Sequence, residues 1–187
     1  MIFAGIDYSL TSPAVTIYDD SKPFVWDNCH SYFLSDLKKT HGVHGNVVGT
    51  PMPLYNSDQE RYQGIAEWVL DILRSHCVDH VFIEDYSYGS TGRVFHIAEN
   101  AGVLKQLLWS SNYKFQTIAP TVIKKHATGK GNASKEAMGE AFIQETIIDL
   151  RPVLNLTEKQ SNPISDIIDS FYIVKTGYFE WLNGSIV

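Results

Sequence analysis

The sequence predicts an α/β fold, with a mixed five-stranded sheet, an antiparallel meander and then parallel strands, flanked by helices. Three short runs of strand-forming residues come first, separated by turn residues, and predict the meander. Two later apolar runs enclose a segment with helical spacing, which is the pattern of a right-handed, parallel strand–helix–strand unit. The 187 residues fit one domain spanning residues 1–187, large enough to bury a core without disulfides.

The meander strands are predicted at residues 1–7, 14–18 and 24–28, with turns at 11–13 and 19–23. Residues 30–56 then carry several glycines and prolines with little periodicity. We expect an extended loop there, beyond the minimal fold, and long loops of this kind often have a function.

The second half of the chain alternates helices with strands. Ser57 and Glu60 have the spacing of a capping box, so they predict the start of a helix that leads into a strand ending at Glu84. The remaining predicted elements are a helix at 94–111, a strand at 115–119, and helices at 134–150 and 164–181, with Pro152 interrupting between the last two.

Four acidic residues stand where ordinary packing would not place a carboxylate. Asp7 ends one apolar run, and Glu84 ends another. A charge at the carboxyl end of a buried strand lies at the sheet edge where ligands of open α/β sheets bind. Asp166 and Asp169 have i, i+3 spacing, so they share one face of the last predicted helix.

If these carboxylates meet, they repel one another and lose hydration unless cations neutralise them. Oxygen-only donor sets suit hard cations, so the sequence predicts Mg²⁺, with Mn²⁺ able to substitute. Two such ions about 4 Å apart would activate a water and stabilise the leaving oxygen in phosphodiester cleavage. Taken singly, each acid also fits an ordinary role as a turn residue, a solvated strand end or a helix cap.

A lysine-rich stretch lies between the second strand-end acid and the acidic helix pair. Residues 114–135 contain five lysines and no acid, although the whole chain has a net charge of −6. Lys124, Lys125, Lys130 and Lys135 belong to this stretch, together with glycines that let backbone amides approach a phosphate. We expect a DNA-contacting edge here; the alternative is a solvated loop with ordinary surface lysines.

The loop after Glu84 is polar, aromatic and rich in glycine. It contains Tyr86, Ser87, Tyr88 and Arg93. This composition suits stacking on exposed bases and hydrogen bonding to phosphates, although tyrosines are also common in cores.

The order of these features resembles the RuvC-type Holliday junction resolvases, nucleases of the RNase H-like superfamily. Gly5-Ile6-Asp7-Tyr8-Ser9 resembles the family's opening strand and turn, and Ile83-Glu84 resembles its second catalytic strand. Residues 119–136 resemble a characteristic stretch, with Pro-x-x-x-Lys-Lys, Thr-Gly-x-Gly and Ala-Ser-Lys-Glu in order. The resemblance spans nearly the whole chain and is weakest over residues 28–60.

The resemblance implies an RNase H-like fold and a metal-dependent endodeoxyribonuclease that resolves Holliday junctions by symmetric paired incisions on opposed strands. It implies a homodimer acting on branched DNA, chiefly four-way junctions, with two Mg²⁺ ions per site. Lys124 and Lys135 fall where the family has basic residues important for cleavage. The implied catalytic, metal-binding acids are Asp7, Glu84, Asp166 and Asp169.

One position departs from the family pattern. The family can carry an aromatic wedge three residues after the catalytic glutamate, and Ser87 stands there in this chain, between Tyr86 and Tyr88. The sequence therefore leaves open which aromatic, if any, opens the junction.

Three alternatives stay open. The nearest is a nuclease that cuts flaps and forks as well as junctions. A sugar kinase or actin-like ATP-binding domain also opens with Gly-Ile-Asp, but it needs a second phosphate loop and about twice the length, so no nucleotide cofactor is expected. The third is a junction-binding protein that does not cleave, which the four acids disfavour.

The composition is that of a soluble globular protein, with 44% hydrophobic and 19% charged residues. We find neither a signal-like start nor an apolar run long enough to span a membrane, so we expect no membrane partner. Cys29 and Cys77 are isolated, which argues against a zinc site and fits a reducing compartment. With the resemblance, this predicts the cytoplasm of a bacterial cell or a phage-infected host.

Overall fold

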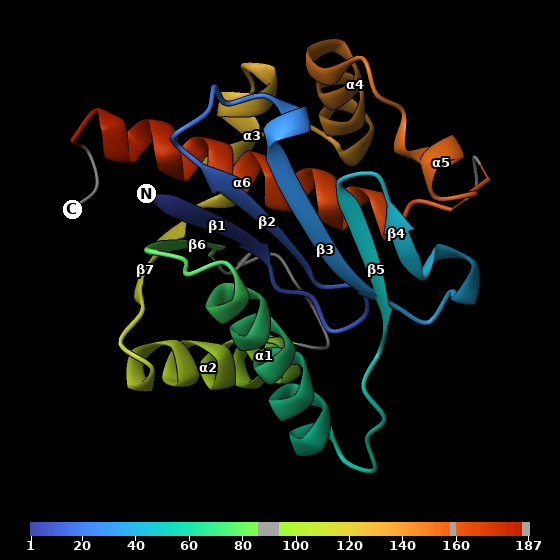
Figure 1. The fold of residues 1–187 in the computed structure, drawn as a ribbon, viewed down its shortest axis with the longest axis vertical. Helices are drawn as coiled ribbons and strands as arrows, with labels where there is room; N and C mark the ends of the chain where they lie inside the picture. Colours follow the sequence, from blue (N-terminus) through green and yellow to red (C-terminus); the bar gives the residue numbers. More distant parts are fainter. Residues whose placement is uncertain (86–93, 158–159, 185–187) are drawn as a thin grey trace.

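The computed structural model describes residues 1–85, 94–157 and 160–184. In these residues a seven-stranded sheet lies between two layers of helices (Figure 1). The strands are β1 (Ile2–Asp7), β2 (Ala14–Asp19), β3 (Cys29–Ser35), β4 (Gly42–His44), β5 (Val47–Pro51), β6 (His80–Glu84) and β7 (Lys114–Ile118). The helices are α1 (Asp58–Ser75), α2 (Val94–Ser110), α3 (Pro120–Thr128), α4 (Lys135–Thr146), α5 (Leu150–Val153) and α6 (Ile164–Leu182), with 3₁₀ turns η1 (Trp26–Asn28) and η2 (Lys38–Thr40).

The strand order across the sheet is β4-β5-β3-β2-β1-β6-β7. Strand β2 is antiparallel to both of its neighbours, β1 and β3, whereas β5, β6 and β7 each join a parallel partner. Five strands (β1, β3, β5, β6 and β7) therefore run in one direction and end at the same edge of the sheet. The predicted α/β class is confirmed, as is the antiparallel start followed by parallel strands, but the sheet has seven strands rather than five.

Successive side chains along the central strands face opposite helix layers. Phe3 and Phe82 pack on the side of α6, while Ala4, Ile6 and Val81 pack on the side of α1 and α2. This alternation follows from the period of two along a strand, and it gives the sheet a core on each face. Both faces of β1 and β6 are buried, which explains their continuous apolar runs.

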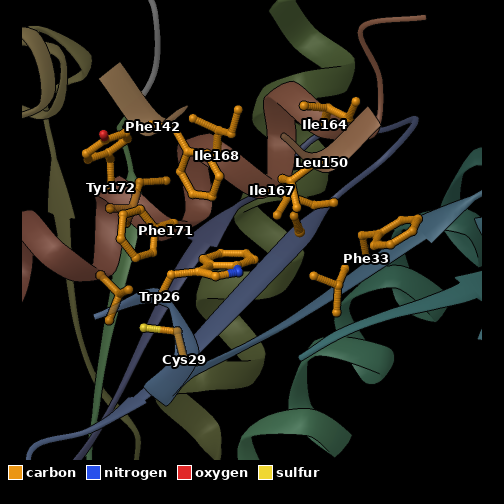
Figure 2. Close-up of a cluster of buried hydrophobic side chains, with 14 of the residues drawn as sticks. Trp26, Cys29, Phe33, Phe142, Leu150, Ile164, Ile167, Ile168, Phe171 and Tyr172 are labelled. Atoms are coloured by element: carbon orange, nitrogen blue, oxygen red, sulfur yellow. The ribbon is translucent and has the colours of Figure 1, made fainter. Parts of the chain in front are cut away.

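The core under α6 is rich in aromatic side chains (Figure 2). Trp26 meets Phe142 and Phe171 edge to face, with ring centroids 4.9 and 5.6 Å apart. Such contacts add about 1 kcal/mol each to the energy of area burial. They fix α4 and α6 against the start of β3, and so hold the helix that carries the acidic pair.

The predicted third strand at 24–28 is wrong, because β3 begins only at Cys29 and the residues before it form η1. Trp26 leaves the strand path to fill the aromatic core, which interrupts extended pairing. Within β3, the polar residues His30 and Ser31 interrupt the apolar pattern of a buried strand. Ser31 is nevertheless fully buried, because its hydroxyl bonds that of Thr16 at 2.8 Å.

The extended loop predicted at 30–56 is also wrong. Most of that segment folds as β3, η2, β4 and β5, which extend the sheet on the side away from β7 (Figure 1). Two of its glycines have positive φ values, 106° at Gly42, where β4 starts, and 67° at Gly45, in the tight turn between β4 and β5. Glycines at a hairpin therefore explain a composition that resembled a loop.

The helices agree more closely with expectation. Ser57 caps α1 by accepting a hydrogen bond from the Glu60 amide at 3.2 Å, as the capping box predicts. The predicted helix at 134–150 ends earlier, at Thr146, and α5 follows as a separate short turn containing Pro152. Helix α3 was not predicted; Pro120 starts it and Gly129, with φ 77°, ends it. In the part of the chain described here, no helix has the length and apolarity needed to cross a membrane.

Candidate nuclease site

The strands aim two carboxylates at the same helix. Every second residue of a strand points to the same face of the sheet, so Phe3, Gly5 and Asp7 of β1 share the face that α6 covers. Phe82 and Glu84 share that face on β6. The parallel register pairs Ile6 with Ile83, so Asp7 and Glu84 follow as the next residues on strands about 4.8 Å apart. Both acids lie at the carboxyl edge of the sheet and are half-buried.

Two glycines let α6 lie directly on these strands. A Cβ on Gly5 would stand 2.3 Å from the Val174 amide nitrogen, and a Cβ on Gly177 would stand 2.2 Å from the Phe82 ring. Both distances are far below any real Cβ contact, so only glycine permits this approach. The close packing brings the first turns of α6 to the ends of β1 and β6.

Asp166 and Asp169 occupy the first turns of α6 on its inner face. Asp166 is 5% exposed, and Asp169 is half-buried beside it. Burial raises the pKa of Asp7 well above its usual range, and the charges of Asp166, Asp169 and Glu84 add to this rise. Asp7 and Asp166 also share a hydrogen bond that favours the proton on Asp7. The four predicted acids therefore form one electrostatic cluster.

Glu84 and Asp169 are perturbed in the same direction. Burial and the charge of Asp169 raise the pKa of Glu84 to about 7, and burial raises the pKa of Asp169 to about 6. Lys124 of α3 and Lys135 of α4 oppose both rises, because each ammonium group stabilises the ionised carboxylates. The structure thus brings these two lysines to the acid cluster, in keeping with the positions that the family resemblance implies for them.

A chain of hydrogen bonds, which the sequence did not reveal, holds Asp166. The Ser12 hydroxyl donates to Asp166 Oδ2 at 2.6 Å, and Asn162 Nδ2 donates to Ser12 Oγ at 3.1 Å. Asn162 Oδ1 accepts from the Ser165 hydroxyl at 2.9 Å, and Lys135 Nζ donates to Ser165 Oγ at 3.5 Å. In each of these four hydrogen bonds the acceptor is the partner nearer to Asp166. The bonds therefore form one continuous path from the exposed Lys135 to the buried Asp166. Ser12 is 154 residues from Asp166, and no local pattern signals such a bond.

The donor set fits a hard divalent cation. It consists of carboxylates on three elements. Burial is the first cause of the raised pKa in all four, and in Asp7, Glu84 and Asp169 the charges of neighbouring acids add to the rise. Within residues 1–85, 94–157 and 160–184, no three histidine, cysteine, aspartate or glutamate side chains already stand in an arrangement that could hold a metal ion.

The other predicted site residues lie farther out or outside the described residues. Lys125 and Lys130 are exposed, on α3 and just after it. Tyr86, Ser87, Tyr88 and Arg93, the predicted base-stacking and phosphate contacts, fall outside the described residues.

Comparison with known proteins agrees with this geometry, although no protein-family model matches the chain. A crossover junction endodeoxyribonuclease RuvC from Sulfurovum sp. strain NBC37-1 is 29% identical over 119 residues, which are 63% of this chain and 69% of that protein. RuvC from Synechococcus sp. strain CC9311 is 26% identical over 124 residues, or 66% and 71% of the two chains. The structure of T. thermophilus RuvC in complex with Holliday junction substrate matches with a TM-score of 0.63 and 17% identity, covering 99% of this chain and 97% of that one. In sequence and in fold, this chain is similar to the RuvC-type Holliday junction resolvases.

Proposed function

We propose that this chain is a divalent-cation-dependent endodeoxyribonuclease that resolves four-way DNA junctions by paired incisions on opposed strands. The observation that carries the proposal is the meeting of four carboxylates from β1, β6 and α6 at one sheet edge, with Lys124 and Lys135 beside them. Similarity to crossover junction endodeoxyribonucleases supports the choice of substrate. We assign the protein to the cytoplasm of a bacterial cell or a phage-infected host.

In this proposal Asp7, Glu84, Asp166 and Asp169 bind Mg²⁺, with two ions per site, and Mn²⁺ can substitute. A bound divalent cation supplies Lewis-acid activation of the attacking water and stabilisation of the leaving oxygen. In the hydrolysis a new P–O bond forms to the water oxygen, which gives up a proton to solvent, while the P–O bond to one sugar breaks and the freed sugar oxygen takes up a proton to become a hydroxyl.

The chain's own residues orient and stabilise this reaction. The Ser12 hydroxyl donates to Asp166 Oδ2 at 2.6 Å and so holds the Asp166 carboxylate in one orientation for binding the cation. Lys124 and Lys135 add positive charge next to the acids, where it stabilises the charge that develops on the phosphate. The exposed Lys125 and Lys130 bind the DNA backbone outside the reacting phosphate.

A homodimer suits the substrate. A four-way junction has near two-fold symmetry, and a C₂ dimer places one active site on each of two opposed strands. Symmetric incision then leaves two duplexes whose nicks can be ligated.

The test is cleavage of a labelled four-way junction beside matched duplex, flap and fork DNAs, in Mg²⁺ and in EDTA. Wild type is compared with Asp7→Asn and with Asp71→Asn, a control that removes an exposed acid on α1. We expect paired nicks on opposed strands of the junction, in Mg²⁺ only, lost in Asp7→Asn and kept in Asp71→Asn.

Other outcomes would change the assignment. Metal-dependent cutting spread over flaps and forks would make the protein a general branch nuclease. Tight junction binding without any cleavage would leave a binding protein and contradict the catalytic role of the acids.

A further inference from the structure

The unpredicted strands β4 and β5 extend the sheet beyond β3, and the segment between β3 and β4 lies near the sheet edge that carries Asp7. Because β3 and β5 run parallel to β1, the end of β3 at Ser35 lies at the same sheet edge as Asp7. The turn η2 follows directly and carries Lys38 and Lys39, both exposed. The segment that was expected to be a loop therefore places two adjacent lysines at the edge that holds the carboxylates.

Turn η2 is held firmly in this place. The Thr40 side chain is fully buried and donates to the Leu37 carbonyl at 2.8 Å, and His41 Nε2 contacts the Ser35 carbonyl at 2.8 Å. A Cβ on Gly49 of β5 would stand 2.0 Å from the Thr40 carbonyl oxygen, so the glycine allows η2 to pack against the strand. The backbone is fixed, while both lysine side chains reach outward.

Lys39 contacts the segment that leads into α6. Its ammonium group donates to Gln160 Oε1 at 2.8 Å, and Gln160 also accepts from the Thr157 amide at 3.2 Å. Lys135 of α4 likewise donates to Ser165, at 3.5 Å. Lysines from η2 and from α4 thus contact residues 160 and 165, at the start of the helix that carries the acidic pair.

This arrangement suggests a second contact for the substrate backbone. A chain with a net charge of −6 needs local positive charge wherever it approaches a polyanion. Lys124 of α3, the helix that follows β7, and Lys135 of α4 supply it beside Glu84. Lys38 and Lys39 supply it toward β5, at the other end of the strand order, and Asp36 is the one acid in the described segment 36–41. Short polar bonds such as Lys39 to Gln160 can exchange for a charge-assisted bond to a phosphate.

Resting on the proposed function, we propose that Lys38 and Lys39 bind backbone phosphates of a duplex arm of the branched substrate, on the β5 side of the active site, away from β7 and α3. The contact is electrostatic and independent of sequence, because exposed lysines read charge rather than base edges. It supports binding and leaves the chemical step to the acid cluster.

The test compares two double variants, Lys38→Ala/Lys39→Ala and the control Lys22→Ala/Lys114→Ala. The control lysines are also exposed, but they lie after β2 and at the start of β7, at the opposite edge of the sheet. Junction binding is measured in EDTA, to prevent cleavage, over a series of salt concentrations. Each lost phosphate contact lowers the slope of log affinity against log salt by about 0.9.

We expect Lys38→Ala/Lys39→Ala to reduce the slope of log affinity against log salt by about 2 per chain, and to lower junction affinity 10- to 100-fold at 0.1 M salt. The Lys22→Ala/Lys114→Ala control should change neither quantity. The single-turnover cleavage rate of Lys38→Ala/Lys39→Ala at saturating protein should stay within about twofold of wild type, since neither lysine belongs to the acid cluster. An unchanged slope, or an equal loss in the control, would overturn the inference while leaving the proposed function intact. A wild type that binds no branched DNA would overturn both.

Discussion

Replacing Glu84 with Gln should stabilise the folded protein when no divalent cation is present. The pKa of Glu84 is raised from 4.5 to about 7 by burial and by neighbouring acids. The folded state therefore binds more protons than the unfolded state, and stability is lost as the pH rises between these two values. Gln carries no charge at any pH, so the variant avoids this loss.

The magnitude follows from the two pKa values. A rise from 4.5 to about 7 corresponds to about 3 kcal/mol that ionised Glu84 removes from stability at pH 8. Because the side chain is only half-buried, solvent screens part of this, and we expect a gain of about 2 kcal/mol. For a chain of this length, that corresponds to about 4–8 °C in the unfolding midpoint.

The assay is thermal unfolding in EDTA at pH 5 and pH 8, with Glu67→Gln, an exposed position on α1, as the matched control. The gain should be large at pH 8 and small at pH 5, and absent from the control at both. In Mg²⁺ the order should reverse, because wild type gains cation binding and the variant loses a ligand. A gain that is equal at the two pH values would refute the electrostatic reasoning.

Three further results are expected. Gly5→Ala should destabilise the protein by about 3 kcal/mol or more in urea unfolding, because the new Cβ would meet the α6 backbone. The control Gly102→Ala, whose new Cβ has no atom within 4 Å, should be neutral or stabilising by up to about 1 kcal/mol. Ser12→Ala should remove about 1–3 kcal/mol because Asp166 loses the hydrogen bond from the Ser12 hydroxyl, and it should raise the Mg²⁺ concentration needed for cleavage. An unchanged Mg²⁺ dependence would argue against a positioning role. Lys135→Ala should slow single-turnover junction cleavage on the order of 100-fold while changing junction affinity less than tenfold, and the reverse pattern would make it a binding residue only.

The acid cluster was predictable from the four acids taken together and in order, since each one alone also fits an ordinary role. Asp7 and Glu84 end apolar runs that indicate buried strands, and the helical spacing of Asp166 and Asp169 places both on one face. The glycines at positions 5 and 177 then determine that this face meets the strands, which the sequence alone does not reveal.

What could not be predicted depends on distant contacts. Trp26 lies outside the strand because it packs against Phe142 of α4 and Phe171 of α6. Ser31 is buried within β3 because its hydroxyl forms a hydrogen bond with that of Thr16. Neither partner is close in sequence. The link from Ser12 to Asp166 has the same character, since a serine beside a proline reads locally as a turn.

The most direct test of the central claim is diffraction from crystals soaked in Mn²⁺, recorded for anomalous scattering in wild type and in Asp7→Asn. We predict anomalous density between Asp7, Glu84, Asp166 and Asp169, with carboxylate oxygens about 2.0–2.2 Å from the ion, and weakened or lost density in the variant. Anomalous density only at other positions, with these four carboxylates unliganded, would contradict the assignment of this cluster as the catalytic metal site.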